Sequence, residues 1–475
     1  MQAVARVVVT SCMYLGDTAP FVPVARRLHE AGHDVTFVAP EGFRSVMGPE
    51  PFDHAPYALD CSPVVLDNDP VHTRLMRHSF LNASRLATLW MDRAFADDPA
   101  AATASLRNNL EGANVVVTHP TMASVTLPVA RSLGAAVVVG HLFPMMIPTT
   151  SWAPPIGSRA LRPPRPLNPA AWQVVRAGTQ LLLRDRAINQ LRRSCGLAPL
   201  RGNAGWAWTE ADATVILASP HYFGSGAPDW PAVTWGGFSI WPDTAPPLDP
   251  ELSAYVDAGP PPVVVTLGTS AAAGAGEKFA HIAADLDAAG FRSVLLVGHE
   301  RNLASVASHP AAVTFAPLTT LLPRCSVAVV SGALGGLAAA ITAGVPVVVH
   351  PQLVDQSWHA RRVAELGWAC QRDERRTSAQ PLPAWHLIPP SRSVPRRWRH
   401  AWPTKTLRAP SWTPFNSSSA DRTVTRSHHQ IADVPAPSQQ RSLGRVSSNA
   451  GRLTPSFGTS GMVAAQSGVR SGRSF

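Results

Sequence analysis

The chain has 475 residues, more than one ordinary hydrophobic core holds, so its length predicts two or three domains. Apolar residues make up 45% and charged residues 15%, which excludes a largely disordered chain and predicts lobes with sizeable cores. The formal charge of +10 would ordinarily indicate a nucleic-acid or anionic-membrane partner.

The positive charge is concentrated at the end of the chain. Residues 371–475 hold 16 Lys and Arg against 4 Asp and Glu, so the preceding residues carry 25 against 27. The tail is rich in Pro, Ser and Arg and lacks helical or strand periodicity, so we interpret it as a shifted reading frame or a disordered extension. A nucleic-acid partner is not predicted, because no aromatic-basic periodicity accompanies the charge, whereas peripheral contact with a membrane stays open.

The cysteines and the N-terminus indicate the compartment. Five cysteines are few, odd in number and without CxxC spacing, so neither a disulfide framework nor a zinc site is predicted. A polar Gly-Asp pair follows the first apolar run, which favours a buried strand over a signal peptide. No segment is long and apolar enough to span a bilayer, and we predict a cytoplasmic protein without a metal centre or organic cofactor.

The first 150 residues repeat one pattern of apolar run, loop, helical stretch, glycine and apolar run. Such alternation is typical of a doubly wound α/β domain with a parallel sheet. The first predicted helix has apolar positions Phe21, Val24, Ala25 and Leu28 at helical spacing after Pro20, and it ends at Gly32. Strands are predicted at 4–10, 34–39, 115–118 and 136–139, and a second helix at 124–133.

The same pattern starts again in the second half of the chain. "LHEAGHDVTFV" and "LDAAGFRSVLLV" are near-repeats, with predicted strands at 263–267 and 293–297 around a predicted helix. Between the halves, residues 151–235 are richer in Pro and Trp and hold one predicted helix at roughly 172–195. We predict two opposed Rossmann-like domains at 1–241 and 263–370, the second incomplete, joined by a linker at 242–262.

Asp17 is the candidate general base. It follows the first predicted strand beside Gly16, where its carboxylate would point into the cleft between the domains. A carboxylate there can take a proton from an attacking hydroxyl. The alternative, that Asp17 only caps the helix beginning near Pro20, is equally open from the sequence.

The second candidate is the sequence Ser-Gly-Ala-Leu-Gly-Gly at residues 331–336. It lies between a predicted strand at 327–330 and a predicted helix at 337–343, where small residues let backbone N–H groups approach a diphosphate. The signal is weak alone, because glycines at such turns often serve only close packing. The candidate donor contacts in this run are Ser331, Gly332 and Gly335.

Two further polar groups follow predicted strands. Asp355 and Gln356 offer an acceptor and an amide that suit vicinal sugar hydroxyls, although a helix cap is the alternative. Gly268, Thr269 and Ser270 follow the first strand of the second domain, where a plain turn is the alternative. Four polar groups at carboxyl ends of strands point jointly to a ligand cleft.

With those residues in place, the chain resembles the bacterial nucleotide-sugar glycosyltransferases of the glycosyltransferase-B fold. The resemblance covers about residues 1–370 and is strongest to the sterol and antibiotic-aglycone branch, in which Gly-Asp replaces the Gly-His of plant and animal relatives. The similar segments are "LGDTAPFVPVARRLHEAGHDVTFVAP", "VVVTHPTMASVTLPVARSLGAAVVVGHLFPMMIP", "PPVVVTLGTS", "FAPLTTLLPRC" and "AGVPVVVHPQLVDQSWHARRVAELG".

The resemblance implies a role for each candidate. Asp17 would be the base of an inverting, metal-independent transfer, and the helix N-terminus would stabilise the leaving diphosphate of a UDP- or dTDP-sugar. Asp355 and Gln356 would hold the sugar. The remaining donor contacts would be Gly268 and Thr269 near the diphosphate and Phe315 to Leu318 at the nucleotide base.

The acceptor would be an apolar molecule such as a lipid, sterol or polyketide. Residues 141–148 suit it, with His141 and Met145 as candidate contacts, although this segment could equally be core. The family's phosphate-binding histidine falls on Ser331 and its threonine on Gly336, so a catalytically inactive relative or a binding protein of the same fold is the alternative. The sequence does not indicate the oligomeric state.

Overall fold

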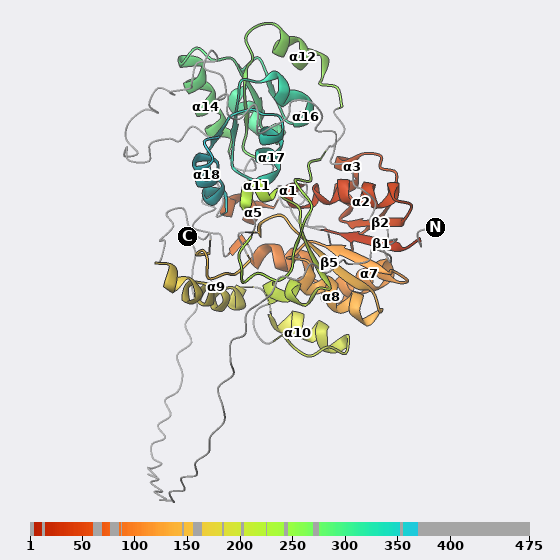
Figure 1. Cartoon of the computed structure of the whole chain (residues 1–475). Coiled ribbons are helices and arrows are strands. Elements are labelled where there is room, and N and C mark those ends of the chain that lie inside the picture. The colour runs from red at the N-terminus through yellow and green to blue at the C-terminus, as the bar shows by residue number, and fades with distance from the viewer. Residues whose placement is uncertain are drawn as a thin grey trace, which may run out of the picture. The chain divides into compact units, whose positions relative to one another are not determined.

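The computed structural model describes residues 4–368, apart from the gaps at 12–14, 60–68, 77–84, 87, 145–146, 155–163, 183–184, 201–203, 225, 242–245, 269–274 and 352–354. The predicted tail at 371–475 therefore lies outside the described residues. The described residues form two parallel β-sheets with helices packed on them (Figure 1).

The first sheet is entirely parallel and has the strand order β3-β2-β1-β4-β5-β6-β7. Figure 1 shows α2 on one side of this sheet and α8 on the other, as a doubly wound fold requires. The strands are β1 (Arg6–Thr10), β2 (Asp34–Ala39), β3 (Asp53–Pro56), β4 (Val115–Thr118), β5 (Ala136–His141), β6 (Ala213–Ile216) and β7 (Thr234–Trp235).

Several elements of the first half differ from the prediction. The sheet extends into residues 213–235 through β6 and β7, which were not predicted. The helix predicted at 172–195 corresponds to α9 (Asn168–Leu182) and α10 (Asp185–Ser194), between which residues 183–184 lie outside the described residues. The other helices are α1 (Leu15–Thr18), α2 (Phe21–Glu30), α3 (Glu41–Met47), α5 (Pro70–Met76), α7 (Pro99–Leu110), α8 (Ala123–Ser132) and α11 (Pro220–Phe223).

The second sheet is also parallel, with the order β10-β9-β8-β11-β12. Successive side chains of a strand point to opposite faces of this sheet. In β8, Val263 and Val265 pack with Phe279 of α14, whereas Val264 packs on the opposite face. The strands are β8 (Val263–Thr266), β9 (Ser293–Leu296), β10 (Ala312–Val313), β11 (Val327–Val330) and β12 (Val347–Val349). The helices are α12 (Pro250–Asp257), α14 (Gly276–Ala288), α15 (Glu300–Leu303), α16 (Leu318–Leu321), α17 (Leu334–Thr342) and α18 (Gln356–Glu365).

The two near-repeats have the same local structure. Gly32 and Gly290 follow α2 and α14 with φ of 87° and 76°, a left-handed conformation that glycine adopts without a steric penalty. In each repeat the next residue donates its N–H to a carbonyl five positions earlier, at 3.2 Å for His33 to Leu28 and 2.9 Å for Phe291 to Leu286. This hydrogen bond ends the helix and turns the chain into the following strand.

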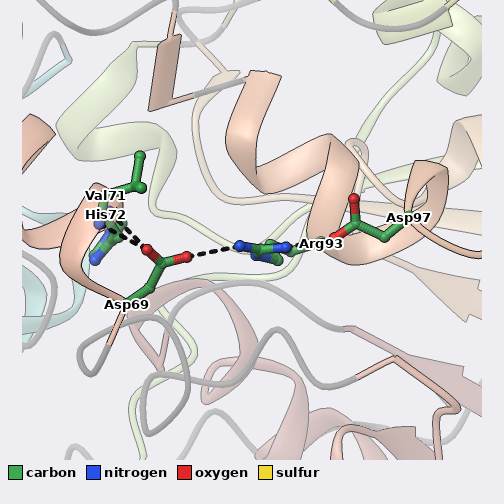
Figure 2. A network of polar contacts seen from close by, with 5 residues as sticks. All are labelled: Asp69, Val71, His72, Arg93 and Asp97. Atoms are coloured by element: carbon green, nitrogen blue, oxygen red, sulfur yellow. Dashed lines mark hydrogen bonds and ion pairs between the residues drawn. The ribbon is translucent and has the colours of Figure 1, made fainter. Parts of the chain in front are cut away.

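A polar network fixes α5 to a π-helical turn at Asp92–Ala96 (Figure 2). Asp69 accepts the N–H of Val71 at 2.7 Å and of His72 at 3.2 Å, and Arg93 pairs with Asp69 at 3.0 Å and with Asp97 at 2.7 Å. Burial opposes ionisation of Asp69, but the hydrogen bonds from Arg93 and the two amides outweigh it and lower the pKa of the carboxyl. The network therefore caps α5 with an ionised aspartate.

No helix within the described ranges is long and apolar enough to cross a membrane. The domain boundaries at 241, 262 and 370 stay predictions. Residues 250–257 of the predicted linker form α12, which Asp249 caps through the N–H groups of Glu251 and Leu252.

Candidate functional site

Three candidate residues, Asp17, Gly268 and Ser331, follow strands at which a sheet reverses its order. In the first sheet β1 pairs with both β2 and β4, and Asp17 lies on the connection that leaves β1. In the second sheet β8 pairs with both β9 and β11; Gly268 follows β8, and Ser331 follows β11 directly. Parallel α/β sheets bind ligands at these points, because adjacent connections run to opposite faces and leave a crevice.

Asp17 lies in the short helix α1 and is half-buried, whereas its neighbour Gly16 is exposed. Pro20 occupies the position before α2, and that helix has no side-chain cap. Asp17 therefore does not cap α2, and this alternative explanation of the residue is removed.

The charge of Asp355 acts on the carboxyl group of Asp17. Burial is the main cause that raises the pKa of Asp17 from 3.8 to about 7, and the negative charge of Asp355 adds to it. Burial also raises the pKa of Asp355 from 3.8 to about 6, while the backbone N–H groups of Asp355 and Gln356 act in the opposite direction. A carboxylate whose pKa lies near neutral pH is well suited to accept a proton at that pH.

Asp355 immediately precedes α18 and makes no side-chain capping hydrogen bond. Its backbone carbonyl accepts the N–H of Trp358 at 2.9 Å and of His359 at 3.3 Å. The backbone carbonyl of Asp355 therefore anchors the helix, whereas its carboxylate interacts with the Gln356 N–H but makes no standard capping hydrogen bond.

The loop after β11 ends in helix α17, which begins at Leu334, three residues earlier than predicted. Gly335 therefore lies in the first helical turn. The first intrahelical bond runs from Leu337 N–H to Ala333 carbonyl at 3.1 Å, and no side chain caps the helix within the described residues. The N–H groups before that bond can receive an anion.

Ser331 and Gly332 shape this loop. Ser331 is 2% exposed, and its hydroxyl accepts the N–H of Ala333 at 3.3 Å. Gly332 has φ of 89°, and a Cβ there would lie 2.7 Å from Val349 Cγ1. Only glycine fits this turn without displacing its surroundings.

Short distances join the candidate groups into one site. A Cβ on Gly268 would lie 3.5 Å from Ser331 Oγ, and one on Gly332 would lie 3.2 Å from the backbone oxygen of Gln356. Helix α1, which carries Asp17, contacts α17. The structure therefore brings Asp17, Gly268, Ser331, Gly332, Asp355 and Gln356 together.

The other candidates are placed differently. Phe315 is 59% exposed, and Leu318 is half-buried at the start of α16. Thr269 and Met145 lie outside the described residues. The contacts assigned to these residues stay predictions.

His141 has a neighbour that the sequence analysis did not select. His119 follows β4 and His141 ends β5, the adjacent strand, and the two side chains are 2% and 3% exposed. Burial lowers the pKa of both to about 3, and the proximity of His141 adds to this for His119, so both are neutral at neutral pH. His119 could have been found from the sequence, because it directly follows the predicted strand at 115–118, and residues after such strands are candidates for a site.

The tautomer of His119 follows from its contacts. Nδ1 accepts the N–H of Thr121 at 3.3 Å and contacts its hydroxyl at 2.7 Å, so the ring proton lies on Nε2. Within the described residues neither this Nε2 nor that of His141 has a hydrogen-bond partner. Two neutral, buried imidazoles therefore lie at the carboxyl ends of β4, which pairs with β1, and of β5.

The described residues contain no group of three or more His, Cys, Asp or Glu side chains arranged to hold a metal ion. The polar groups that the structure brings together are the carboxylates of Asp17 and Asp355, the Ser331 hydroxyl, the Gln356 side-chain amide and backbone amides.

Comparison with known proteins agrees with this architecture. Residues 283–384 match the family described as erythromycin biosynthesis protein CIII-like, C-terminal domain. The chain is 29% identical over 381 residues to a vancomycin aglycone glucosyltransferase of Amycolatopsis orientalis, covering 78% of this chain and 86% of that protein.

Two solved structures share the fold. The glycotransferase of kitacinnamycin superposes with a TM-score of 0.53 at 17% identity, and glycosyltransferase VinC in complex with dTDP with 0.50 at 18%. Each covers 77% of this chain and 86% of the solved chain. Fold and sequence together identify the chain as a glycosyltransferase of the glycosyltransferase-B fold, related to the bacterial enzymes that glycosylate antibiotic aglycones.

Proposed function

We propose that the chain transfers a hexose or deoxyhexose from a UDP- or dTDP-sugar to a hydroxyl of an apolar acceptor, with inversion at C1 and without a metal. The observation that carries the proposal is Asp17, whose pKa is raised to about 7 beside Asp355. Similar proteins support this choice of acceptor and donor, since one is named for an antibiotic aglycone and the structure of another is a complex with dTDP.

In this reaction Asp17 accepts the proton of the acceptor hydroxyl while the hydroxyl oxygen attacks C1 of the sugar. A bond forms between that oxygen and C1, and the bond from C1 to the diphosphate oxygen breaks. The electron pair of the broken bond leaves with the nucleoside diphosphate. A single displacement from the opposite face inverts the configuration at C1.

The second domain would bind the donor. The N-terminus of α17 offers backbone N–H groups to the diphosphate, and the positive end of its dipole stabilises the charge that develops there. Asp355 and Gln356 would accept and donate hydrogen bonds to the sugar hydroxyls. The Ser331 hydroxyl accepts from Ala333 and keeps its own proton for a phosphate oxygen.

The acceptor would lie against the first domain. The apolar environment of His141, whose ring meets Trp208 edge-on at 4.5 Å, suits an apolar molecule with few polar groups. Met145 remains a proposed acceptor contact. A cytoplasmic location and the absence of an organic cofactor are likewise proposals.

Calorimetric titration of the full chain with UDP, dTDP and their glucose conjugates tests donor binding, and release of nucleoside diphosphate with an added apolar alcohol tests transfer. Micromolar binding with acceptor-dependent release supports the proposal. Binding without release would favour the alternative of an inactive binding protein, to which Ser331 in place of the family's histidine points. Absence of binding to every nucleotide would overturn the nucleotide-sugar assignment.

A further inference from the structure

Tyr222 in α11 is fully buried against α18, although the two helices are far apart in the sequence. Its hydroxyl is 2.9 Å from His359 Nδ1, a hydrogen bond that spans 137 positions. Its backbone carbonyl accepts the Nε–H of Arg362 at 2.6 Å. Tyr222 therefore contacts α18 through both its side chain and its backbone.

Aromatic packing surrounds these hydrogen bonds. The ring of Tyr222 stacks on His359 with a centroid distance of 5.8 Å and an interplanar angle of 10°. Phe223 stacks on Trp358 at 5.3 Å and 16°. Stacked rings bury apolar area and add directional contact, so they restrict the rotation of α18 about its axis.

One face of α18 carries these contacts and begins at the candidate site. Asp355, His359 and Arg362 are spaced at i, i+4 and i+7, which places them on the same side of a helix. Asp355 lies close enough for its charge to raise the pKa of the Tyr222 phenol, for which burial is the main cause. A rotation of α18 that broke the contact with Tyr222 would also displace Asp355 and Gln356.

We propose that Tyr222 and His359 are positioning residues: the hydrogen bond between them holds α18 in the orientation that presents Asp355 and Gln356 to the sugar of the donor. The inference rests on the proposed function, since it assigns the sugar to these two residues. The inference goes beyond the proposed function, because it makes sugar binding depend on a tyrosine that contacts no substrate.

Binding of the sugar and binding of the nucleotide should depend on the orientation of α18 to different degrees. Gly268 and Ser331 lie next to each other on the loops after β8 and β11, and within the described part of the chain neither is hydrogen-bonded to Tyr222 or His359. The diphosphate contacts of Gly268 and Ser331 should therefore survive a small displacement of α18 better than the sugar contacts do, even though the neighbouring Gly332 packs on Gln356. The contacts of Asp355 and Gln356 should not, because one end of α18 carries both.

The test compares Tyr222→Phe with Tyr57→Phe in the full chain. Tyr57 is also a buried tyrosine, and its hydroxyl donates to the Ala94 carbonyl at 2.7 Å in the first domain. Both variants keep the ring and lose one buried hydrogen bond, so their effects on folding should be similar. Only Tyr222→Phe should act on the sugar.

Affinities for dTDP-glucose and dTDP, and for the UDP pair, are measured by calorimetry. We expect Tyr222→Phe to weaken binding of the nucleotide sugar about fivefold, the effect of one net hydrogen bond, and to leave nucleoside diphosphate binding unchanged. KM for the donor should rise in parallel with little change in kcat. His359→Leu should give the same loss, and the double variant no more than either single one, because both remove one interaction.

Equal weakening of nucleotide sugar and nucleoside diphosphate, or the same pattern in Tyr57→Phe, would overturn the inference while leaving the proposed function standing. Unchanged donor affinity in a folded Tyr222→Phe chain would overturn it as well. If the unaltered chain binds neither member of the pair, the proposed function fails and the inference fails with it.

Discussion

Replacement of Asp17 by asparagine should make the protein more stable and less active. The pKa of Asp17 is raised from 3.8 to about 7, mainly by burial. Keeping this carboxyl ionised in the folded protein therefore lowers the free energy of unfolding at neutral pH. Because the folded pKa lies above the unfolded one, this cost is absent below pH 3.8 and fully present above about pH 7. Asparagine carries no charge and avoids the cost at every pH.

The size of the gain follows from the two pKa values. Each pH unit between them corresponds to about 1.4 kcal/mol, so values of 3.8 and about 7 set upper limits of about 4 kcal/mol at pH 8 and about 2 kcal/mol at pH 5. Asp17 is only half-buried, so solvent reduces both figures, and we expect the advantage of Asp17→Asn to grow by about 1–2 kcal/mol from pH 5 to pH 8. Loss of the base should lower kcat by about 10²- to 10⁴-fold.

Urea unfolding of both proteins at pH 5 and pH 8 measures the stability difference, and release of nucleoside diphosphate measures activity. Asp53→Asn removes an exposed negative charge from β3 of the same sheet and is the matched control. An advantage for Asp17→Asn that stays constant or shrinks as pH rises would refute the reasoning, because the cost would then not come from ionising a buried carboxyl.

Three other substitutions test the site. Asp355→Asn should move the acid limb of the kcat/KM profile to lower pH, because the charge of Asp355 helps to raise the pKa of Asp17; an unmoved limb would contradict the coupling. Ser331→Ala should weaken binding of nucleoside diphosphate about tenfold in calorimetry, the effect of one hydrogen bond to a charged group, and unchanged affinity would remove Ser331 from the phosphate site. Gly332→Ala should destabilise the protein by about 1–3 kcal/mol, since its φ of 89° and the 2.7 Å approach to Val349 disfavour a Cβ; an unchanged melting temperature would contradict that geometry.

The sequence predicted the elements with strong periodicity. β2 and β4 have the predicted bounds, and helix α14 lies between β8 and β9 where a helix was predicted, because buried parallel strands and amphipathic helices leave regular apolar patterns. β6 has four residues, as β4 has, and its sequence Ala-Thr-Val-Ile could have been selected as a strand but was overlooked. β7 was missed because it has only two residues, too few for a period to be seen. The four-residue helix α1 was missed for the same reason.

The start of α17 shows where local preference fails. Glycines at 335 and 336 disfavour a helix, so the helix was predicted to begin at 337. Leu334 and Leu337 are both buried at a spacing of three residues, and their packing extends the helix to residue 334. Tertiary contacts therefore outweighed the intrinsic preference of the two glycines.

The candidate site was predictable only in part. Residues after the carboxyl ends of strands could be selected from the sequence, since topology alone places them at one edge of each sheet. The influence of Asp355 on Asp17 and the hydrogen bond between Tyr222 and His359 join residues far apart in the chain, so no local pattern indicates them. His119 could have been selected by the same strand-end rule and was overlooked.

The configuration of the product at C1 tests the central claim most directly. The full chain is incubated with an α-linked UDP- or dTDP-glucose and an apolar alcohol, and the anomeric proton of the glycoside is observed by NMR. Single displacement assisted by Asp17 predicts a β-linked product that Asp17→Asn does not form at a comparable rate. An α-linked product, or a β-linked product formed equally fast by Asp17→Asn, would contradict the account.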